Sequence, residues 1–377
     1  MSTASLSAGK VDISATPKSR WTAALPPIAW ILVLATVLRF ASIVVLRSFM
    51  HPNTWEFGPP AAALLHGEGY VYAGVLSAYM PPGYGFLLAG FLRAFGANPQ
   101  VYLFLEILQG ALGVLLVYLV FLLAVQLYSA RTALAAALLA TLYPPFIQAC
   151  NEFHPISFYI VLGTAVVFFL VKAVQVPEKL SFVIYSGLCL GCLVLFRAEA
   201  VGLAIVFAIF LALQRRSQSL VRAAVFLGIV FAIMLPWTVR NHRIFHAFIP
   251  ISTSGPLNLW IGNNPNATGS DRAKVGYVQF SMPPAMLAEL QAIPHLPDNE
   301  IQQGKVYNRE TISYITSHPG HEITLALRKF ILFWTFDPNH DKGRKPAYWV
   351  PSVLLSLAAL LGLLAEKSRH CASWRRS

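Results

Sequence analysis

Long apolar runs alternate with short polar ones along this chain of 377 residues. A helix needs about 20 predominantly apolar residues to cross the hydrocarbon core of a bilayer, and only helices and closed barrels satisfy their backbone groups there. The pattern therefore predicts an all-α polytopic membrane protein with about eight spans. We expect these spans at residues 21–46, 101–127, 132–143, 156–174, 180–196, 198–213, 223–237 and 349–365.

Polar stretches interrupt this pattern in two places. The first, 47–96, is rich in Gly and Pro and contains PPGYGFLLAGFLRAFG, which is too short and too broken by glycines for a span and favours a juxtamembrane or re-entrant helix. The second, 238–348, is long enough for a small domain or an elaborate loop. Inside it, EITLALRKFILFWTF is amphipathic and predicts an interfacial helix.

The remaining divisions follow from the same pattern. We expect a disordered tail at 1–20, a module of seven spans at 21–237, a last span at 349–365 and a basic tail at 366–377. Pro144 and Pro145 are expected to end or kink the third span, because proline cannot continue the hydrogen-bond ladder of a helix.

Composition and charge narrow the class of protein. Hydrophobic residues make up 56% of the chain and charged residues 12%, against about 25% charged in soluble domains. The net charge is +12, but the basic residues lie at the ends of apolar runs and form no patch interleaved with aromatics. We therefore expect topology signals and contacts with anionic membrane lipids, and no binding of nucleic acid.

The positions of Lys and Arg predict the orientation of the spans. With the N-terminus inside, the cytoplasmic turns are basic, whereas the short outer turns carry only Arg197. Both termini are then cytoplasmic, and the stretches 47–96 and 238–348 lie on the outer side. Arg39, near the far end of the first span, is expected to reach the interface with its long side chain.

The first outer loop carries candidate chemistry. Glu56 and Glu68 lie within TWEFGPPAAALLHGEGYVYAGVLSAYMPPG and are two of only sixteen acids in the chain. A carboxylate held against a membrane beside aromatic residues is costly to desolvate, which indicates a functional site. The alternative for Glu56 is a structural role, paired with Arg47 or capping a helix. Glu68, between two glycines, fits a turn or a contact to sugar hydroxyls.

Four segments carry a resemblance to a known family: WEFGPPAAALLHGEGY, AYMPPGYGFLLAGFLRAFG, LVLFRAEAVGL and PWTVRNHRIFHAFIPISTSGPLNLWIGNNPNATG. Through them the chain resembles the C-type (GT-C) membrane glycosyltransferases, in particular the bacterial protein mannosyltransferase-like family 39 proteins related to the lipid A aminoarabinose transferases. The resemblance extends over about 21–269. It implies a GT-C-type helical bundle with juxtamembrane helices in the first outer loop and a larger outer loop after span seven.

The resemblance also implies an activity. It points to an inverting transfer of a sugar, hexosyl or pentosyl, from a polyprenyl-phosphate donor to a lipid, protein or glycan acceptor. The reaction would take place at the outer, periplasmic face of the bacterial inner membrane. Such a transfer needs a base for the acceptor hydroxyl and a cationic clamp for the departing lipid phosphate. It has little need of a cofactor, because the lipid phosphate is already a fair leaving group.

Roles follow for particular residues. Glu56 is the expected base, because the family places an acidic residue at this position of the first loop. Arg240, just past the outer end of a span, is the expected phosphate clamp, since a guanidinium can fork onto phosphate oxygens. Arg243 and Arg197 are further candidates, although Arg197 and Glu199 could simply compensate one another.

Other polar residues are candidates for sugar and acceptor binding. With Glu68 they are Tyr79, Tyr84, His154, Asn258 and Asn263. The two tyrosines could equally form an interfacial aromatic belt, and the asparagines could simply build turns. His154, in NEFHP, could orient the donor or be an ordinary interfacial histidine. No spacing typical of a metal site occurs, and the resemblance leaves open a divalent ion near this turn.

Two other classes of protein remain in competition with an enzyme. A polyprenyl-lipid flippase or transporter would explain the spans, and a non-catalytic lipid-binding relative would keep the fold. Transporters tend to show internal repeats and charged groups at the membrane midplane. This chain shows no repeat and gathers its polar residues at one face, which favours the glycosyltransferase.

Overall fold

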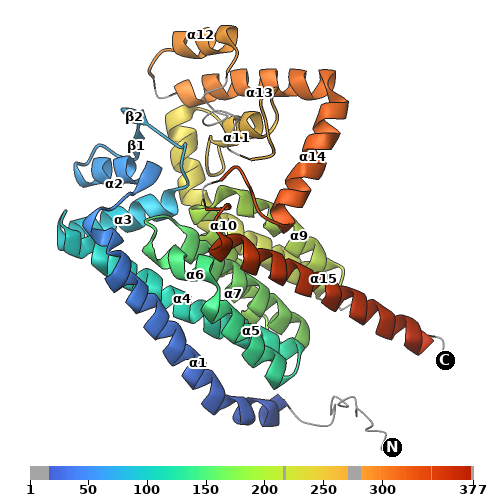
Figure 1. Ribbon diagram of the computed structural model, residues 1–377. Helices are drawn as coiled ribbons and strands as arrows, with labels where there is room; N and C mark the ends of the chain where they lie inside the picture. Colours follow the sequence, from blue (N-terminus) through green and yellow to red (C-terminus); the bar gives the residue numbers. More distant parts are fainter. Residues whose placement is uncertain (1–16, 215–217, 271–281, 297, 341, 375–377) are drawn as a thin grey trace, which may run out of the picture. The chain divides into compact units, whose positions relative to one another are not determined.

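The computed structural model describes residues 17–214, 218–270, 282–296, 298–340 and 342–374 (Figure 1). Contacts divide the chain into two compact units. Unit 1 comprises Met1–Ala61 and Pro81–Pro236, and unit 2 comprises Ala62–Met80 and Trp237–Ser377. The chain passes between them within α2 (Gly58–Leu65), after Met80, and within α10 (Ser219–Phe245). Each unit is described by itself.

Unit 1 is helical throughout its described residues, and its helices begin where the sequence supplies caps. Asn98 accepts a hydrogen bond from the Val101 amide, and Ser129 accepts one from the Thr132 amide, so both satisfy free N–H groups of a first turn. Besides α2 and α10, the elements are α1 (Pro17–Leu46), η1 (Ser48–Met50), η2 (Trp55–Phe57), α3 (Pro82–Phe95), α4 (Pro99–Leu127), α5 (Ala130–Leu142), α6 (Pro144–Gln148), η3 (Ala149–Asn151), α7 (Ile156–Gln175), α8 (Ser181–Phe196), η4 (Ala198–Ala200) and α9 (Val201–Ala212).

Helix α4 is the centre of the unit 1 bundle. It packs against α1, α5 and α7, and α7 packs in turn against α8 (Figure 1). Between α1, α4 and α5 the buried side chains include Ala133, Ala137 and Ala140, which present little bulk, together with Val117 and Phe121 of α4. Small residues at such interfaces let helices in a membrane approach closely, where dispersion rather than the hydrophobic effect drives their association.

The class predicted from the sequence, an all-α polytopic membrane protein, is confirmed. Within the described residues, five helices are long and apolar enough to cross a membrane, against about eight expected spans. A sixth candidate is the pair Ala130–Leu142 and Pro144–Asn151, which bends by 57° at the two prolines, as their chemistry predicts. The expected fifth and sixth spans are the shorter apolar helices Ser181–Phe196 and Ala198–Ala212.

Arg39 does not reach toward an interface, so the expectation of a snorkelling side chain was wrong. The residue is 0% exposed, and its guanidinium donates to the carbonyls of Ala35 (3.2 Å) and Ala140 (3.3 Å). Space for it exists because α4 carries Gly113 at this point, where a Cβ would lie 2.5 Å from the Arg39 Nε. The two carbonyl acceptors inside the bundle replace the water molecules that would solvate the guanidinium at the surface.

Unit 2 contains the one strand pairing of the described residues. Strands β1 (Val71–Tyr72) and β2 (Val75–Leu76) form an antiparallel hairpin, a feature that the sequence analysis missed. Its turn residues Ala73 and Gly74 both have positive φ, 51° and 83°, as tight two-residue hairpins of type I′ require. The signal was the dipeptide Ala-Gly between the two short apolar pairs Val-Tyr and Val-Leu.

The helices of unit 2 surround a small core of their own. They are α11 (Gly255–Gly262), α12 (Pro284–Ala292), α13 (Asn299–Ser317), α14 (Pro319–Trp334) and α15 (Pro346–Trp374). Trp260, Met286 and Val306 are buried together between α11, α12 and α13. The region 238–348 contains helices α11 to α14, and α14 corresponds to the predicted amphipathic helix.

Two boundaries differ from those expected. Helix α10 continues to Phe245, beyond the predicted end at 237, and α15 continues to Trp374, beyond 365. Neither extension contains a proline or a glycine that would end a helix. The expected tail at 1–20 falls mostly outside the described residues.

Gly83 provides a test of the packing in unit 1. A Cβ at this position of α3 would lie 2.8 Å from the Leu195 carbonyl oxygen and 3.1 Å from the Phe196 ring. We expect Gly83→Ala to destabilise the protein by about 1–3 kcal/mol through overpacking, seen as a lower apparent Tm in detergent.

Gly90, on the same helix, is the matched control. A Cβ there meets no atom within 4 Å, so Gly90→Ala should leave the Tm unchanged or raise it slightly, because alanine favours helix. Equal stability of the two variants would contradict the close approach of α3 to the end of α8.

Candidate functional site

Glu56 lies in a tight turn, η2, whose backbone is strained. Trp55, just before it, has φ 49°, a conformation that is costly for a large side chain. Phe57 is buried, and its amide donates to the Thr54 carbonyl at 3.1 Å. A Cβ on Gly58 would lie 2.2 Å from Thr54 Oγ1, so only glycine fits the close of this turn.

The Glu56 carboxylate is half-exposed, and among the described contacts it makes no hydrogen bond or ion pair. The structural alternative, an ion pair with Arg47, is not formed, and Arg47 Nε donates to the Val44 carbonyl instead. The side chain is therefore held at a fixed place by its neighbours while its oxygens remain available.

A chain of aromatic rings connects this turn with other parts of unit 1. The Phe57 ring packs edge to face on Tyr84 (centroids 5.2 Å apart) and on His154 (5.6 Å). Tyr84 in turn packs on Phe158 at 6.0 Å, and Phe158 stacks on Phe196 at 5.1 Å. Edge-to-face and offset arrangements are the favourable ones for rings, so the chain fixes the orientation of η2.

The structure places Tyr84 inside unit 1 and not on an open groove. Its ring is 0% exposed, and within the described residues its hydroxyl has no hydrogen-bond partner. Burial raises the pKa of the Tyr84 phenol, so the group stays neutral. The Tyr84 ring therefore supports Phe57 by packing against it.

His154 is half-buried at the turn before α7. Its amide donates to the Glu152 carbonyl at 2.8 Å, and Glu152 Oε1 accepts from Gln148 Nε2 at 3.0 Å. The part of the chain that the structure describes contains no group of three His, Cys, Asp or Glu side chains that could hold a metal ion.

Arg197 lies at the break between α8 and η4, next to the last ring of the aromatic chain. It is exposed, its Nε is 3.7 Å from Glu199 Oε2, and its guanidinium lies 5.0 Å from the Tyr159 ring centroid. An exposed ion pair of this length contributes little to stability, so the pair with Glu199 leaves the Arg197 guanidinium able to bind another anion. Unit 1 thus joins Glu56, His154, Tyr84 and Arg197 through packed rings.

Arg240, in unit 2, is engaged with the backbone. Its Nη1 donates to the Ser77 carbonyl (2.7 Å) and to Asn241 Oδ1 (3.0 Å), and its Nη2 donates to the Tyr70 carbonyl (3.3 Å). The guanidinium also lies 4.6 Å from the Trp237 ring centroid. Its fork therefore fixes both ends of the hairpin, whereas Arg243 is exposed on the last turn of α10.

Glu300 of α13 is a residue that the sequence analysis missed. Its carboxylate accepts from the Ala78 amide (3.0 Å), from Thr253 Oγ1 (2.6 Å) and from Ser77 Oγ. The contact with Ser77 joins positions more than 200 residues apart, and no local pattern could have shown it. The one local signal was an acid in the first turn of a helix.

Tyr79 lies beside this carboxylate. Its amide donates to Ser77 Oγ at 2.9 Å, and its ring stacks on Tyr72 with centroids 5.3 Å apart and planes 15° from parallel. Burial also raises the pKa of the neighbouring Tyr70 phenol.

The other predicted sugar contacts have separate surroundings. Asn263 donates to the Leu259 carbonyl (2.8 Å), and its Oδ1 accepts from Lys329 Nζ (2.7 Å). Asn258 and Glu68 are exposed, and neither side chain has a hydrogen bond among the described contacts. The roles of these three residues in binding sugar or acceptor stay predictions.

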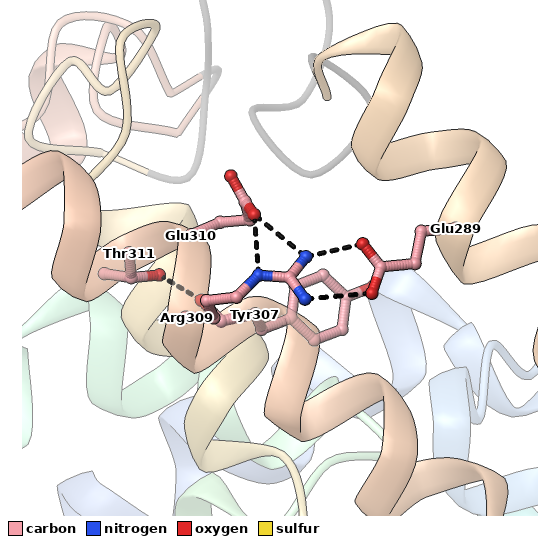
Figure 2. Close-up of polar contacts among 5 residues, drawn as sticks. All are labelled: Glu289, Tyr307, Arg309, Glu310 and Thr311. Carbon is pink, nitrogen blue, oxygen red and sulfur yellow. Dashed lines mark hydrogen bonds and ion pairs between the residues drawn. The ribbon is translucent and has the colours of Figure 1, made fainter.

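A polar clamp on the surface of unit 2 joins α12 to α13. Figure 2 shows Arg309 donating from both terminal nitrogens to the two Glu289 oxygens and from Nε to Glu310. The hydrogen bonds from Arg309 hold the pKa of the Glu289 carboxyl below its ordinary value. The backbone carbonyl of Tyr307, one turn earlier, accepts from Thr311 Oγ1 at 2.7 Å.

Comparison with known proteins agrees with this architecture. Residues 79–239 match the family model described as dolichyl-phosphate-mannose-protein mannosyltransferase. A search of curated proteins found no match to the chain. The matched residues are less than half of the chain, and they support the predicted resemblance to the GT-C membrane glycosyltransferases. The apolar helices agree with a multi-pass membrane protein. Glu56 and Arg240 lie outside the matched residues.

The fork of Arg240 can be tested by a conservative change. Lysine is a point charge and cannot donate to the Tyr70 and Ser77 carbonyls together, so Arg240→Lys should loosen the hairpin. Hydrogen exchange at 70–78 should be about tenfold faster, as the loss of about 1.4 kcal/mol implies.

Arg243→Lys, three residues later on the same helix, is the control and should leave exchange at 70–78 unchanged. If Arg240→Lys also leaves it unchanged, the guanidinium does not hold the hairpin.

The clamp of Glu289 predicts a pH dependence. Because the pKa of Glu289 is lowered in the folded state, its contribution is present above the ordinary range near 4.3 and is lost as pH falls through the folded value. Intrinsic-rate-corrected hydrogen exchange of α12 should therefore quicken at acid pH in the wild type.

In Glu289→Gln the exchange of α12 should already be fast at neutral pH and should depend less on pH. An α12 that exchanges equally in both proteins at pH 7 would show that the clamp contributes nothing to docking this helix.

Proposed function

We propose that the protein catalyses an inverting transfer of a hexosyl or pentosyl group from a polyprenyl phosphate to an acceptor hydroxyl, with Glu56 as the base. In a single displacement the acceptor oxygen attacks the anomeric carbon, Glu56 takes the hydroxyl proton, and the lipid phosphate leaves with the bonding electrons. The base must lie within hydrogen-bond reach of the acceptor and must have no competing partner.

The availability of the Glu56 carboxylate is the observation that carries this proposal. Its oxygens make no hydrogen bond or ion pair among the described residues, although the chain has 28 basic side chains and only 16 acidic ones. A strained residue such as Trp55 costs of order 1–3 kcal/mol and persists where the surroundings over-determine it, which is typical of active sites. The buried Phe57 and its ring partners supply those surroundings.

For the leaving phosphate, Arg197 is the favoured clamp. It is exposed, only weakly paired, and adjacent to the ring chain that orients Glu56. A guanidinium can donate two parallel hydrogen bonds to phosphate oxygens. Arg243, also exposed, is a second candidate, and Arg240 is assigned a positioning role because its terminal nitrogens already donate to carbonyls.

The sugar and the acceptor are assigned to the remaining predicted residues. Tyr79, Asn258, Asn263 and Glu68 keep their predicted role as sugar or acceptor contacts, while His154 and Tyr84 would act through Phe57. The acceptor is a lipid, a protein or a glycan. The distribution of basic residues supports cytoplasmic termini and a reaction at the outer face of the membrane. The bacterial inner membrane is proposed from the resemblance to the bacterial family 39 proteins.

Donor turnover by purified protein in lipid nanodiscs tests the proposal. With a panel of polyprenyl-phosphate sugars, release of polyprenyl phosphate should be lost by about 10²–10⁴-fold in Glu56→Gln while donor binding persists. Glu178→Gln, which makes the same change at an exposed acid in the turn between α7 and α8, is the matched control and should retain the activity.

Two results would oppose the proposal. Undiminished turnover by Glu56→Gln would remove Glu56 from the role of base. Scrambling of polyprenyl lipids in vesicles that persists in Glu56→Gln, with no donor turned over, would favour the flippase.

A further inference from the structure

A cavity of about 480 Å³ opens in unit 2 between the hairpin and α13, within the size range of small-molecule sites. Of its lining residues, the roles proposed above include only Tyr79, as a sugar or acceptor contact. Its wall is formed by Tyr72 and Tyr79 from the hairpin segment, Leu287 from α12, and Asn299, Gln303 and Tyr307 from α13.

The three residues from α13 form one polar stripe. They are spaced four residues apart along the helix, and such positions lie one above the other on the same face. An amide, a second amide and a phenol therefore line one wall at successive turns. A ligand along this wall meets hydrogen-bonding groups at regular intervals.

Asn299 supplies the most specific of these groups. The residue is only 5% exposed, and its Oδ1 has no hydrogen-bond partner among the described residues. A buried acceptor without a donor is destabilising, so a ligand hydroxyl that donates to it is favoured over a ligand without a donor. The cavity thus contains a built acceptor that requires an O–H or N–H donor.

The opposite wall is aromatic. Tyr72 and Tyr79 stack within 15° of parallel and present an apolar body with polar hydroxyls at its edge. A pyranose ring has the matching character, because its C–H face is apolar and its equatorial hydroxyls point outward from the rim.

Charge in the described part of the cavity disfavours an anion. Among the described residues no Lys or Arg lines it, and the acid at its wall is Glu300, whose carboxylate is held as an acceptor by Ala78, Ser77 and Thr253. His295 Nε2 donates to the Ala73 carbonyl at 2.8 Å and so serves the turn of the hairpin. The terminal nitrogens of Arg240, which interacts with Glu300, already donate to carbonyls, so a neutral ligand suits this wall better than a phosphate.

We propose that this cavity binds a neutral saccharide of one or two rings, the glycan part of the acceptor. The assignment to the acceptor rests on the proposed function, whereas saccharide binding itself does not. The sugar lies with one C–H face against the Tyr72–Tyr79 pair and donates a hydroxyl to Asn299 Oδ1.

Binding can be measured without the donor lipid. Saturation-transfer NMR on the full-length protein in nanodiscs would use methyl glycosides of glucose, mannose and galactose, their disaccharides, and a sugar 1-phosphate. At least one neutral sugar should bind, and the phosphate should bind more weakly because of Glu300. Asn299→Leu should weaken the sugar by about fivefold to tenfold, since it removes one hydrogen bond.

Asn308→Leu is the matched control, because it makes the same change on the same helix outside the cavity wall. It should bind as the wild type does, and so should Glu56→Gln, which separates this site from the base. A protein that fails in turnover but binds the sugar would therefore overturn only the catalytic assignment.

Three results would overturn the site. The first is that no neutral sugar binds, and the second is that Asn299→Leu and Asn308→Leu bind the sugar equally. The third is that an unglycosylated Ser/Thr peptide binds in the cavity and that none of the sugars displaces it. In the last case the cavity would be a peptide site.

Discussion

Unit 2 is organised around one carboxylate, that of Glu300. Its two oxygens accept from a backbone amide and two hydroxyls, which belong to the segment after the hairpin and to the chain before α11. A carboxylate removed from water is stable only when its lone pairs are satisfied in this way. The arrangement joins the start of α13 to segments far apart in the sequence, and Arg240 fixes the same segment from the other side.

Unit 1 depends on packing more than on hydrogen bonds at the corresponding place. The turn of Glu56 is oriented by rings that extend from Phe57 through Tyr84 and Phe158 to the residue before Arg197. Packed rings fix the position of this turn without using its polar atoms, so the Glu56 carboxylate makes no hydrogen bond or ion pair among the described contacts, and Arg197 has only an exposed ion pair with Glu199 and a contact with the Tyr159 ring. The protein thereby separates the groups that hold the site from those that would react.

The sequence predicted the features that local pattern controls. Apolar runs located the long helices, the prolines after Leu142 predicted the bend, and the amphipathic run predicted α14. What it missed depends on distant partners. Arg39 was expected at an interface because its carbonyl acceptor in α5 and the space beside Gly113 are not visible from its neighbours. Glu300 was missed for the same reason, and the placing of Tyr84 inside the unit depends on rings from two other segments, η2 and α7.

The fit between Arg39 and Gly113 has a consequence for how this sequence can vary. The guanidinium fills the volume that any side chain at position 113 would need, with the Cys150 sulfur on its other flank at 2.9 Å from such a Cβ. A larger residue at 113 would have to expel the cation into hydrocarbon, while a small apolar residue at 39 would leave a void beside a helix made for close approach. The space at position 113 and the cation at position 39 are therefore one structural unit, and a change at either position requires a change at the other.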